Sequence, residues 1–508
     1  MPRQKAPSLP PPNSKSRNFG EEGRKHNTKA SLSSLIKSSR DIMRKDAGLN
    51  GDLDRLPQLS WILFLKCYDD LEIRREEDAK ATRQKYKPII PPPYRWRDWA
   101  SNENEGATGE DLIKFVNDGL LPALRGLSGS DERLKVAEVF KETYSRMLSG
   151  YLLRDVVNLV DGIHFQSKDE IFTLAHLYES MLKEMRDAAG DSGEFYTPRP
   201  VVKLIVDRTK PRLGETVLDP ACGTGGFLVE AYEYLKPLAK NSKDQIKLQS
   251  GTLYGVEKKP LPYLLGTMNL LLHGVENPSF VRHDNTLARP YVSWGAADRV
   301  DIVLTNPPFG GEEEAGIQLN FPESLRASET ALLFMQFVMR SLKHGGRCGV
   351  VVPNGFLFGD GVSARIKEQL LRNFDLHTIV RLPTGVFAPY TGIATNLLFF
   401  ARSQPTTDIW FYEVPARDGG RYSKSKPMQF DEFQNCIAWW DERVENEFAW
   451  KVSAKTVLES GCNLDIRNPK RLEAIEHRPP EVIAKDILEK EARIFEIVKD
   501  INQLLENK

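Results

Sequence analysis

The sequence predicts an α/β fold in which a doubly wound, mostly parallel sheet follows a helical N-terminal region. Apolar runs of strand length occur at 216–219, 252–257, 279–283, 301–305, 347–352, 378–382 and 396–400. Helical spacing separates several of them, at 226–234, 262–272, 331–342 and 363–373. Strands that alternate with helices form parallel sheets, and ligands of such sheets bind at the carboxyl ends of the strands.

The chain before this sheet is predicted to be helical. Residues 1–30 contain three consecutive prolines, scattered basic residues and few apolar ones, so we expect a disordered basic tail, either solvated or touching phosphate. Residues 31–170 repeat the apolar spacing of amphipathic helices, with a proline-rich loop at 87–94. Another helix is predicted at 171–187. The helical domain at 31–170 shows no catalytic signal of its own.

The chain after the sheet is predicted to be an extension over 411–478 and a helix over 479–508. Ile487, Ile494 and Ile501 recur every seven residues, as do Val498 and Leu505, and the opposite face is charged. This spacing is typical of a coiled-coil helix that docks on a partner. Packing of the helix on its own chain is the alternative.

The composition excludes several classes of protein. Lys+Arg and Asp+Glu both number 70, whereas a protein that binds DNA alone is usually basic, so any DNA affinity must come from local patches or a partner. The five cysteines form no C-x-x-C pair, so we expect no metal site and a reducing, cytoplasmic location. The apolar run 61–65 is too short to span a membrane, and the N-terminus lacks the apolar core of a signal peptide.

A glycine-rich turn follows the first predicted strand. Such a turn lets the backbone approach a ligand, and the helix after it presents free N–H groups and the positive end of its dipole. The turn has neither the G-x-G-x-x-G order nor a P-loop lysine, so a nucleotide phosphate is not the first expectation. The alternative is a purely structural turn. We expect Gly223, Thr224, Gly225 and Gly226 to hold a cofactor. Asp219 could meet a positive ammonium group of that cofactor, directly or through water.

Acidic residues lie at the end of the next predicted strand and directly after the one that follows it. Glu257 lies where a carboxylate accepts hydrogen bonds from ribose hydroxyls in related folds. It follows Asp219 by 257 − 219 = 38 residues, more than the roughly twenty of a dinucleotide fold, because the polar stretch 236–249 enlarges the connection. Asp284 follows the third strand and is expected near the adenine of the cofactor.

The sequence Asn306-Pro307-Pro308-Phe309 follows a buried strand and suits a planar amino group. The side-chain oxygen of Asn306 and the carbonyl of Pro307 can each accept one N–H, which favours a tetrahedral nitrogen aimed at a methyl group carried by the cofactor. The prolines stiffen the loop, and Phe309 can stack on a flat ring; if that ring is a base in a duplex, it must be flipped out to reach the loop. The alternative is a proline-rich turn with Phe309 in the core.

Four segments resemble the modification (M) subunits of type I restriction–modification systems, a family of N6-adenine DNA methyltransferases. They are 193–199, 219–227, 306–309 and 463–469, and their order matches the gamma arrangement of amino-methyltransferases. The resemblance implies a seven-stranded, Rossmann-like methyltransferase domain over 171–410, with S-adenosylmethionine as cofactor and adenine in double-stranded DNA as substrate. It leaves the basic N-terminal tail unexplained.

The resemblance also implies residue roles. The expected catalytic positions are Asn306, Pro307, Pro308 and Phe309. The expected cofactor contacts are Glu194, Phe195, Tyr196, Thr197, Pro198, Arg199, Thr224, Gly225, Gly226 and Glu257.

The partners expected from the resemblance are other subunits of a complex. Only about a hundred residues follow the last predicted strand, which is short for reading a bipartite site because one small DNA-binding module already takes of order 60 residues. We therefore expect a separate specificity (S) subunit, with two M chains per S chain and restriction (R) subunits in the full complex. The 479–508 helix is then a docking helix.

Two other functions fit parts of the pattern. An Asn-Pro-Pro loop also suits the planar amide of glutamine, so a protein glutamine-N5 methyltransferase is one alternative. A catalytically silent, cofactor-binding scaffold within a defence complex is the other, although the intact Asn306 and Phe309 disfavour it.

Overall fold

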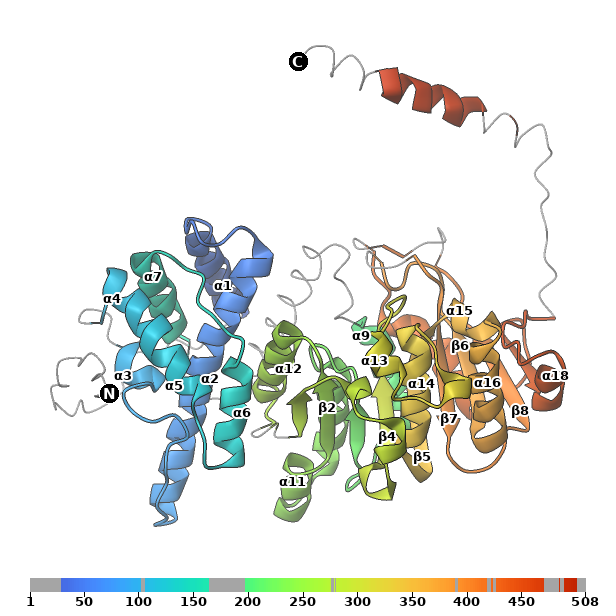
Figure 1. Cartoon of the computed structure of the whole chain (residues 1–508), viewed down its shortest axis with the longest axis horizontal. Coiled ribbons are helices and arrows are strands. Elements are labelled where there is room, and N and C mark those ends of the chain that lie inside the picture. The colour runs from blue at the N-terminus through green and yellow to red at the C-terminus, as the bar shows by residue number, and fades with distance from the viewer. Residues whose placement is uncertain are drawn as a thin grey trace. The chain divides into compact units, whose positions relative to one another are not determined.

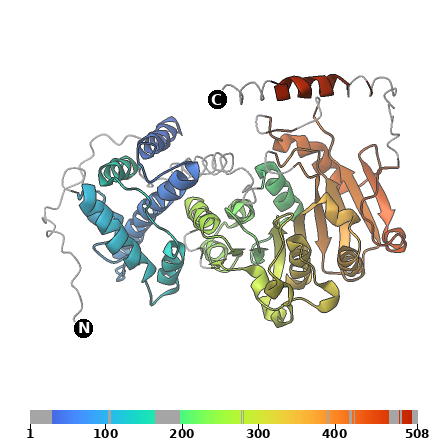
Figure 2. The same cartoon turned by 45° about the horizontal axis from the view of Figure 1, so that its top comes forward.

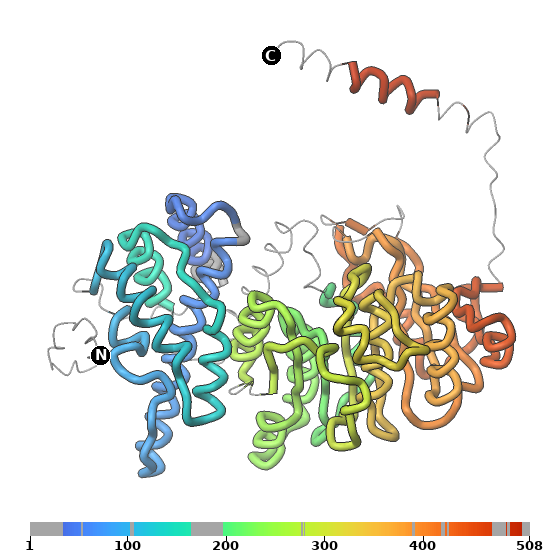
Figure 3. The backbone as a smooth tube through the Cα atoms, in the orientation of Figure 1, coloured from blue at the N-terminus to red at the C-terminus, as the bar shows by residue number. Residues whose placement is uncertain are grey.

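The computed structural model describes residues 29–101, 106–163, 197–275, 278, 280–388, 392–417, 422–423, 426–469, 484 and 488–499. The chain divides into two compact units, Met1–Ile466 and Arg467–Lys508. The helix expected at 171–187 and the N-terminal tail to residue 28 lie outside the described residues. In the second unit, residues 488–499 form a helix, which is the red segment near the C-terminus in Figure 3.

The N-terminal part of the first unit is helical, as expected. Trp61 and Phe64 of the long second helix are buried, and the Phe64 ring meets the Phe140 ring edge-on at 5.4 Å. The apolar run 61–65 therefore forms the core of a helical domain. Within the described residues, no helix is both long and apolar enough to cross a membrane. The helices are α1 (Lys29–Met43), α2 (Asp52–Ala81), α3 (Trp96–Trp99), α4 (Gly109–Lys114), the π-helix η1 (Phe115–Leu120), α5 (Leu121–Arg125), α6 (Asp131–Phe140) and α7 (Gly150–Asp161).

A large sheet dominates the rest of the first unit (Figure 1). The strand order is β3-β2-β1-β4-β5-β7-β6-β8-β9. β7 runs antiparallel to β5 and β6, and β9 runs antiparallel to β8, whereas the other neighbours are parallel. The strands are β1 (Val217–Asp219), β2 (Leu253–Glu257), β3 (Val281–His283), β4 (Val300–Thr305), β5 (Leu342–Pro353), β6 (Asp375–Arg381), β7 (Thr395–Ala401), β8 (Asp408–Glu413) and β9 (Ala449–Ser453).

The expectation of seven strands is wrong, because the described residues form nine. All seven expected strands are present, and β8 and β9 extend the sheet beyond β6. β9 pairs with β8 from Ala449 to Ser453, but only Ala449 and Trp450 are buried. A strand with so short an apolar run carries little pattern to recognise in a sequence.

Helices cover both faces of the sheet, so the doubly wound architecture is confirmed. In β5, Val350 and Val352 belong to one hydrophobic core and Val351 to the other, as the alternation of side chains across a strand requires. Figure 2 shows these helices from a second direction. The helices are α9 (Arg199–Thr209), α10 (Gly226–Leu235), α11 (Ser242–Gln249), α12 (Pro260–Leu272), α13 (Ala315–Gln318), α14 (Thr330–Ser341), α15 (Asn354–Phe358), α16 (Val362–Asn373), α17 (Gln434–Glu442) and α18 (Ala454–Glu459).

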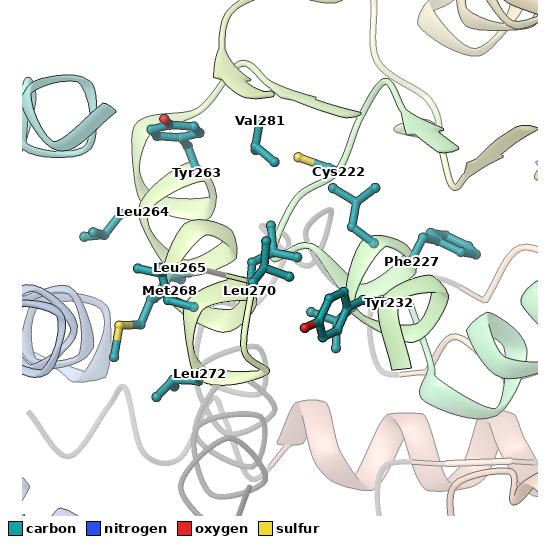
Figure 4. Close-up of a cluster of buried hydrophobic side chains, with 14 of the residues drawn as sticks. Cys222, Phe227, Tyr232, Tyr263, Leu264, Leu265, Met268, Leu270, Leu272 and Val281 are labelled. Atoms are coloured by element: carbon teal, nitrogen blue, oxygen red, sulfur yellow. The ribbon is translucent and has the colours of Figure 1, made fainter. Parts of the chain in front are cut away.

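The core beneath the glycine-rich turn is formed by two helices and the turn itself. Tyr263 and Met268 of α12, Cys222 of the turn, and Phe227 and Tyr232 of α10 are all buried in one cluster. Figure 4 shows these side chains on and around the two helices, with Tyr232 on the side of α10 that faces α12. Cys222 is thus a packed apolar residue, and burial raises the pKa of its thiol well above the ordinary value. This packing fixes the turn against α12.

Candidate active site

The glycine-rich turn lies between β1 and α10 and needs its glycines. Gly223 and Gly225 have φ angles of 51° and 75°, in the left-handed region that side chains disfavour. The turn also touches the backbone of α12, since a Cβ on Gly266 would lie 2.8 Å from the carbonyl oxygen of Gly223. The start of α10 is thus held close to α12. Its first N–H groups, which have no partner within the helix, lie at the carboxyl end of β1.

Glu257 at the end of β2 fastens the turn. One carboxylate oxygen accepts from the backbone N–H of Gly223 at 2.9 Å, and the other accepts from Lys259 at 2.7 Å. Burial raises the pKa of this carboxyl, and the two backbone hydrogen bonds oppose the rise. Each oxygen keeps a second lone pair, so Glu257 can still accept from a ligand hydroxyl.

Asp219 at the end of β1 is buried, with 1% of its surface exposed. Its Oδ1 accepts from the Thr305 hydroxyl at 2.8 Å and from the Ala221 N–H at 3.2 Å. Burial raises the pKa of Asp219 to about 7. A positive ligand group would relieve the cost of keeping this carboxylate charged. Asp284, after β3, is exposed, and its backbone N–H donates to the Glu257 carbonyl at 3.0 Å.

Asn306, immediately after β4, is oriented by the loop that precedes α9. Its amide nitrogen donates to the Thr197 hydroxyl at 3.0 Å. Its Oδ1 is buried and, among the described residues, receives no hydrogen bond. A buried acceptor without a donor costs free energy unless a ligand supplies one. This oxygen is therefore set to receive an N–H from a bound molecule.

A cavity of about 220 Å³ at the carboxyl ends of β1, β2 and β4 brings most of the expected residues together. Arg199 closes one side, and its guanidinium donates to the Gly226 carbonyl at 2.9 Å. Pro198 lies just outside as the N-cap residue of α9. The expected residues that line the cavity are Thr197, Arg199, Asp219, Gly223, Thr224, Gly226, Glu257, Asp284, Asn306 and Pro308.

Three expected residues of the Asn-Pro-Pro-Phe motif and the glycine-rich turn do not line the cavity. Pro307 is buried directly after Asn306, and Gly225 faces the backbone of α12. Phe309 is half-buried, and its ring meets that of Phe387 edge-on at 6.4 Å. Phe309 thus packs against the core next to Pro308, which lines the cavity.

The comparisons with known proteins agree with this geometry. Residues 169–478 match the family model described as N-6 DNA methylase, and residues 32–160 match that of the HsdM N-terminal domain. The chain is 47% identical over 488 residues to the methylase subunit of the type I restriction enzyme EcoEI from Escherichia coli. That alignment covers 94% of this chain and 98% of the relative. The chain belongs to the N-6 DNA methylase family.

Solved structures of the same family share the fold. A modification subunit of a putative type I restriction enzyme from Vibrio vulnificus is 55% identical, with a TM-score of 0.81. It covers 89% of this chain, and 99% of that structure is matched. A chain from a study of complex assembly and conformational transition in a type I system is 41% identical, with a TM-score of 0.79 over 95% of this chain and 99% of its own. The resemblance to type I modification subunits is confirmed.

Some residues of this methylase site were not anticipated from the sequence. Glu313 has only 9% of its side chain exposed, and its carboxylate lies 3.6 Å from the Lys258 ammonium group. Both line the cavity, as do Thr330 and Phe334 at the start of α14. A run of three glutamates at 312–314, which follows the Asn-Pro-Pro-Phe motif after two glycines, was the available signal. Glu194, Phe195 and Tyr196 lie outside the described residues.

Proposed function

We propose that this chain is the methylase subunit of a type I restriction–modification enzyme, acting in the cytoplasm. It transfers a methyl group from S-adenosylmethionine to the exocyclic N6 of a flipped-out adenine in double-stranded DNA. The observation that carries the proposal is the buried Asn306 Oδ1, which lies within the segment that matches the N-6 DNA methylase model and lacks a donor among the described residues. An adenine amino group supplies that donor.

The residues around the cavity fit an adenosyl sulfonium cofactor. The buried carboxyl of Asp219 suits its ammonium group, and the remaining lone pairs of Glu257 suit the ribose hydroxyls. Asp284 at the exposed rim suits the adenine. The glycine-rich turn packs closely on α12. The N-terminal end of α10 can then bind the polar part of the cofactor through its free N–H groups.

The chemistry requires only positioning of the amino group. S-adenosylmethionine supplies a methyl carbon bound to a positive sulfur. Asn306 Oδ1 and the Pro307 carbonyl accept the two N–H groups, so the nitrogen lone pair turns toward that carbon. One N–C bond forms as the C–S bond breaks, and one amino proton leaves to water afterwards. Phe309 holds the base by stacking on its face.

The partners proposed for this chain are a specificity subunit, a second methylase subunit and restriction subunits in the complete enzyme. The relative from Escherichia coli is named as a subunit of such an enzyme, and it matches this chain over 98% of its length. Ile494 and Val498 of the 488–499 helix are 61% and 48% exposed, beside exposed Leu488, Phe495 and Ile497. Exposed apolar side chains of this kind suit a helix that docks in a coiled coil. Ile487, Ile501 and Leu505 lie outside the described residues.

The proposal is tested by replacing the acceptor. Asn306→Ala, purified with its specificity subunit, is expected to bind S-adenosylmethionine normally and to transfer no labelled methyl group to unmethylated genomic DNA. The matched control is Asn241→Ala, which removes an asparagine that caps α11 on the surface. Transfer by Asn306→Ala at the wild-type rate contradicts the mechanism. Label found in protein instead of DNA would identify a glutamine methyltransferase.

A further inference from the structure

The outer edge of β3 is bound by side chains from the helical domain. β3 is the first strand of the sheet order, so only one side of it pairs with another strand, β2. In a parallel pair, alternate residues turn both backbone groups toward the neighbour. Asp284 N–H donates to Glu257 on that inner side. Val281 and His283 therefore turn their backbone groups outward, where a further strand would lie.

Two residues of α6 take the place of that further strand. The Lys135 ammonium group donates to the Val281 carbonyl, and Glu138 accepts from the His283 N–H at 2.9 Å. The two side chains lie one helical turn apart and bind each other at 2.6 Å. A donor and an acceptor thus meet one carbonyl and one N–H of the same strand edge. We name Lys135 and Glu138 the edge clamp.

Tyr263 of α12 joins the edge clamp to the sheet. Its hydroxyl donates to Glu138 at 2.9 Å and accepts from Lys135 at 3.0 Å. Its ring stacks on the His283 ring, with 5.2 Å between centroids and 17° between planes. Figure 4 labels Tyr263 on α12 and Val281 on the adjacent strand. Lys135 and Tyr263 are buried and Glu138 is half-buried, so the clamp is a partly buried network whose polar groups satisfy one another.

The edge clamp leads directly to the cavity. Asp284 follows His283 and lines the cavity, and its N–H binds the Glu257 carbonyl. The Glu257 carboxylate in turn binds the Gly223 N–H of the glycine-rich turn. The C-terminal end of β3 is thus held on its outer side by hydrogen bonds from α6 and on its inner side by hydrogen bonds to β2.

We infer that Lys135 and Glu138 are positioning residues of the cofactor cavity, through which the helical domain holds Asp284 and the end of β3 in place. The inference rests on the proposed function for the ligand, since Asp284 is proposed to contact the adenine of the cofactor. Loosening the clamp lets Asp284 move away from the cavity, so cofactor affinity falls while the reaction at Asn306 is unaffected at saturating cofactor.

The test compares two buried cations of the helical domain in the full chain. Lys135→Met removes the clamp donor, and Arg154→Met removes a cation that binds the carbonyls of Ala100 and Ala107, away from the cavity. Both are expected to lower the melting temperature. Only Lys135→Met is expected to weaken S-adenosylhomocysteine binding, by about three- to thirtyfold, with kcat unchanged at saturating cofactor. Glu138→Gln keeps an acceptor for His283 and is expected to fall between wild type and Lys135→Met.

A second measurement separates this inference from the proposed function. Amide hydrogen exchange at residues 281–284, followed without any ligand, is expected to be faster in Lys135→Met than in wild type and unchanged in Arg154→Met. Equal exchange in all three proteins overturns the clamp. Equal cofactor affinity in Lys135→Met and Arg154→Met also overturns it. Failure of wild type to bind S-adenosylhomocysteine overturns the proposed function, and the exchange result still decides the clamp.

Discussion

The Asn306 amide nitrogen donates to the Thr197 hydroxyl at 3.0 Å, so a residue more than a hundred positions earlier fixes which way the Asn306 oxygen faces. Thr197 belongs to a loop that was expected to contact the cofactor. The hydrogen bond gives it a further task, since it orients the oxygen that we propose accepts from the target amino group.

Thr197→Val is therefore expected to lower kcat for DNA methylation by about ten- to a hundredfold, since a misplaced reacting group costs that much. Affinity for S-adenosylhomocysteine is expected to stay near wild type. Radiolabel transfer under saturating cofactor, together with calorimetric binding, measures both. Thr197→Ser keeps the hydroxyl and serves as the control, and a loss of activity in it equal to that of Thr197→Val contradicts the argument.

Asp219 couples stability to pH. Its pKa in the folded chain, about 7, exceeds the ordinary 3.8. The folded chain therefore holds this proton more tightly than the unfolded chain, and that contribution to stability, complete below about pH 4, is lost as the pH rises through about 7. Asp219→Asn keeps an acceptor for Thr305 without the charge. Relative to wild type, its melting temperature is expected to rise between pH 5 and pH 8 in the absence of ligand.

The same substitution is expected to weaken cofactor binding, because the ammonium group loses its counter-charge. A variant that is more stable at pH 8 yet binds the cofactor less tightly has the trade-off expected of a strained functional site. Thermal melts over this pH range and binding at pH 8 provide the data. A melting-temperature difference that does not change with pH would show that Asp219 is ionised throughout.

Gly266→Ala is expected to destabilise the chain although it lies within a helix. Alanine normally favours a helix over glycine by about 1 kcal/mol. Here its Cβ would lie 2.8 Å from the Gly223 carbonyl oxygen. Overpacking against backbone costs about 1–3 kcal/mol and shifts the glycine-rich turn, so the melting temperature and the cofactor affinity both fall.

The matched control is Gly119→Ala in η1, where a Cβ would lie 3.8 Å from its nearest neighbour, on the Tyr94 ring. That variant is expected to be neutral or slightly more stable. Should Gly266→Ala melt as high as Gly119→Ala, the contact between α12 and the turn does not constrain the site.

Phe309 is expected to hold the flipped base by stacking, with Phe387 supporting its ring from the side. Stacking on an aromatic ring contributes about 1–3 kcal/mol per base, so Phe309→Ala should lower methylation of DNA about five- to a hundredfold. Cofactor affinity should be unchanged. Fluorescence of 2-aminopurine at the target position reports whether the base leaves the stack. Phe309→Trp keeps a ring and is expected to retain most activity.

The sequence predicted the parts of the site that depend on local chemistry. Left-handed φ angles at Gly223 and Gly225 follow from the turn composition, and the strand ends at Asp219 and Glu257 follow from apolar patterning. The rule that ligands bind at the carboxyl ends of parallel strands then brought them together.

The parts that were missed depend on tertiary placement. Lys258 and Glu313 are 55 positions apart, and only the folded loop before α14 brings them to 3.6 Å. The support of Phe309 by Phe387 depends on where the turn at 384–388 lies. β9 was not predicted because it is stabilised as a strand by its pairing with β8, and not by a pattern in its own composition.

The bonds from α6 to Val281 and His283 bear on attempts to shorten this protein. Cutting the chain before residue 197 would leave the outer N–H and C=O groups of β3 unpaired, and these could pair with β3 of another molecule. Such a fragment should aggregate on expression, so a compact version for DNA-labelling work has to keep α6 or carry a charged residue or proline in β3.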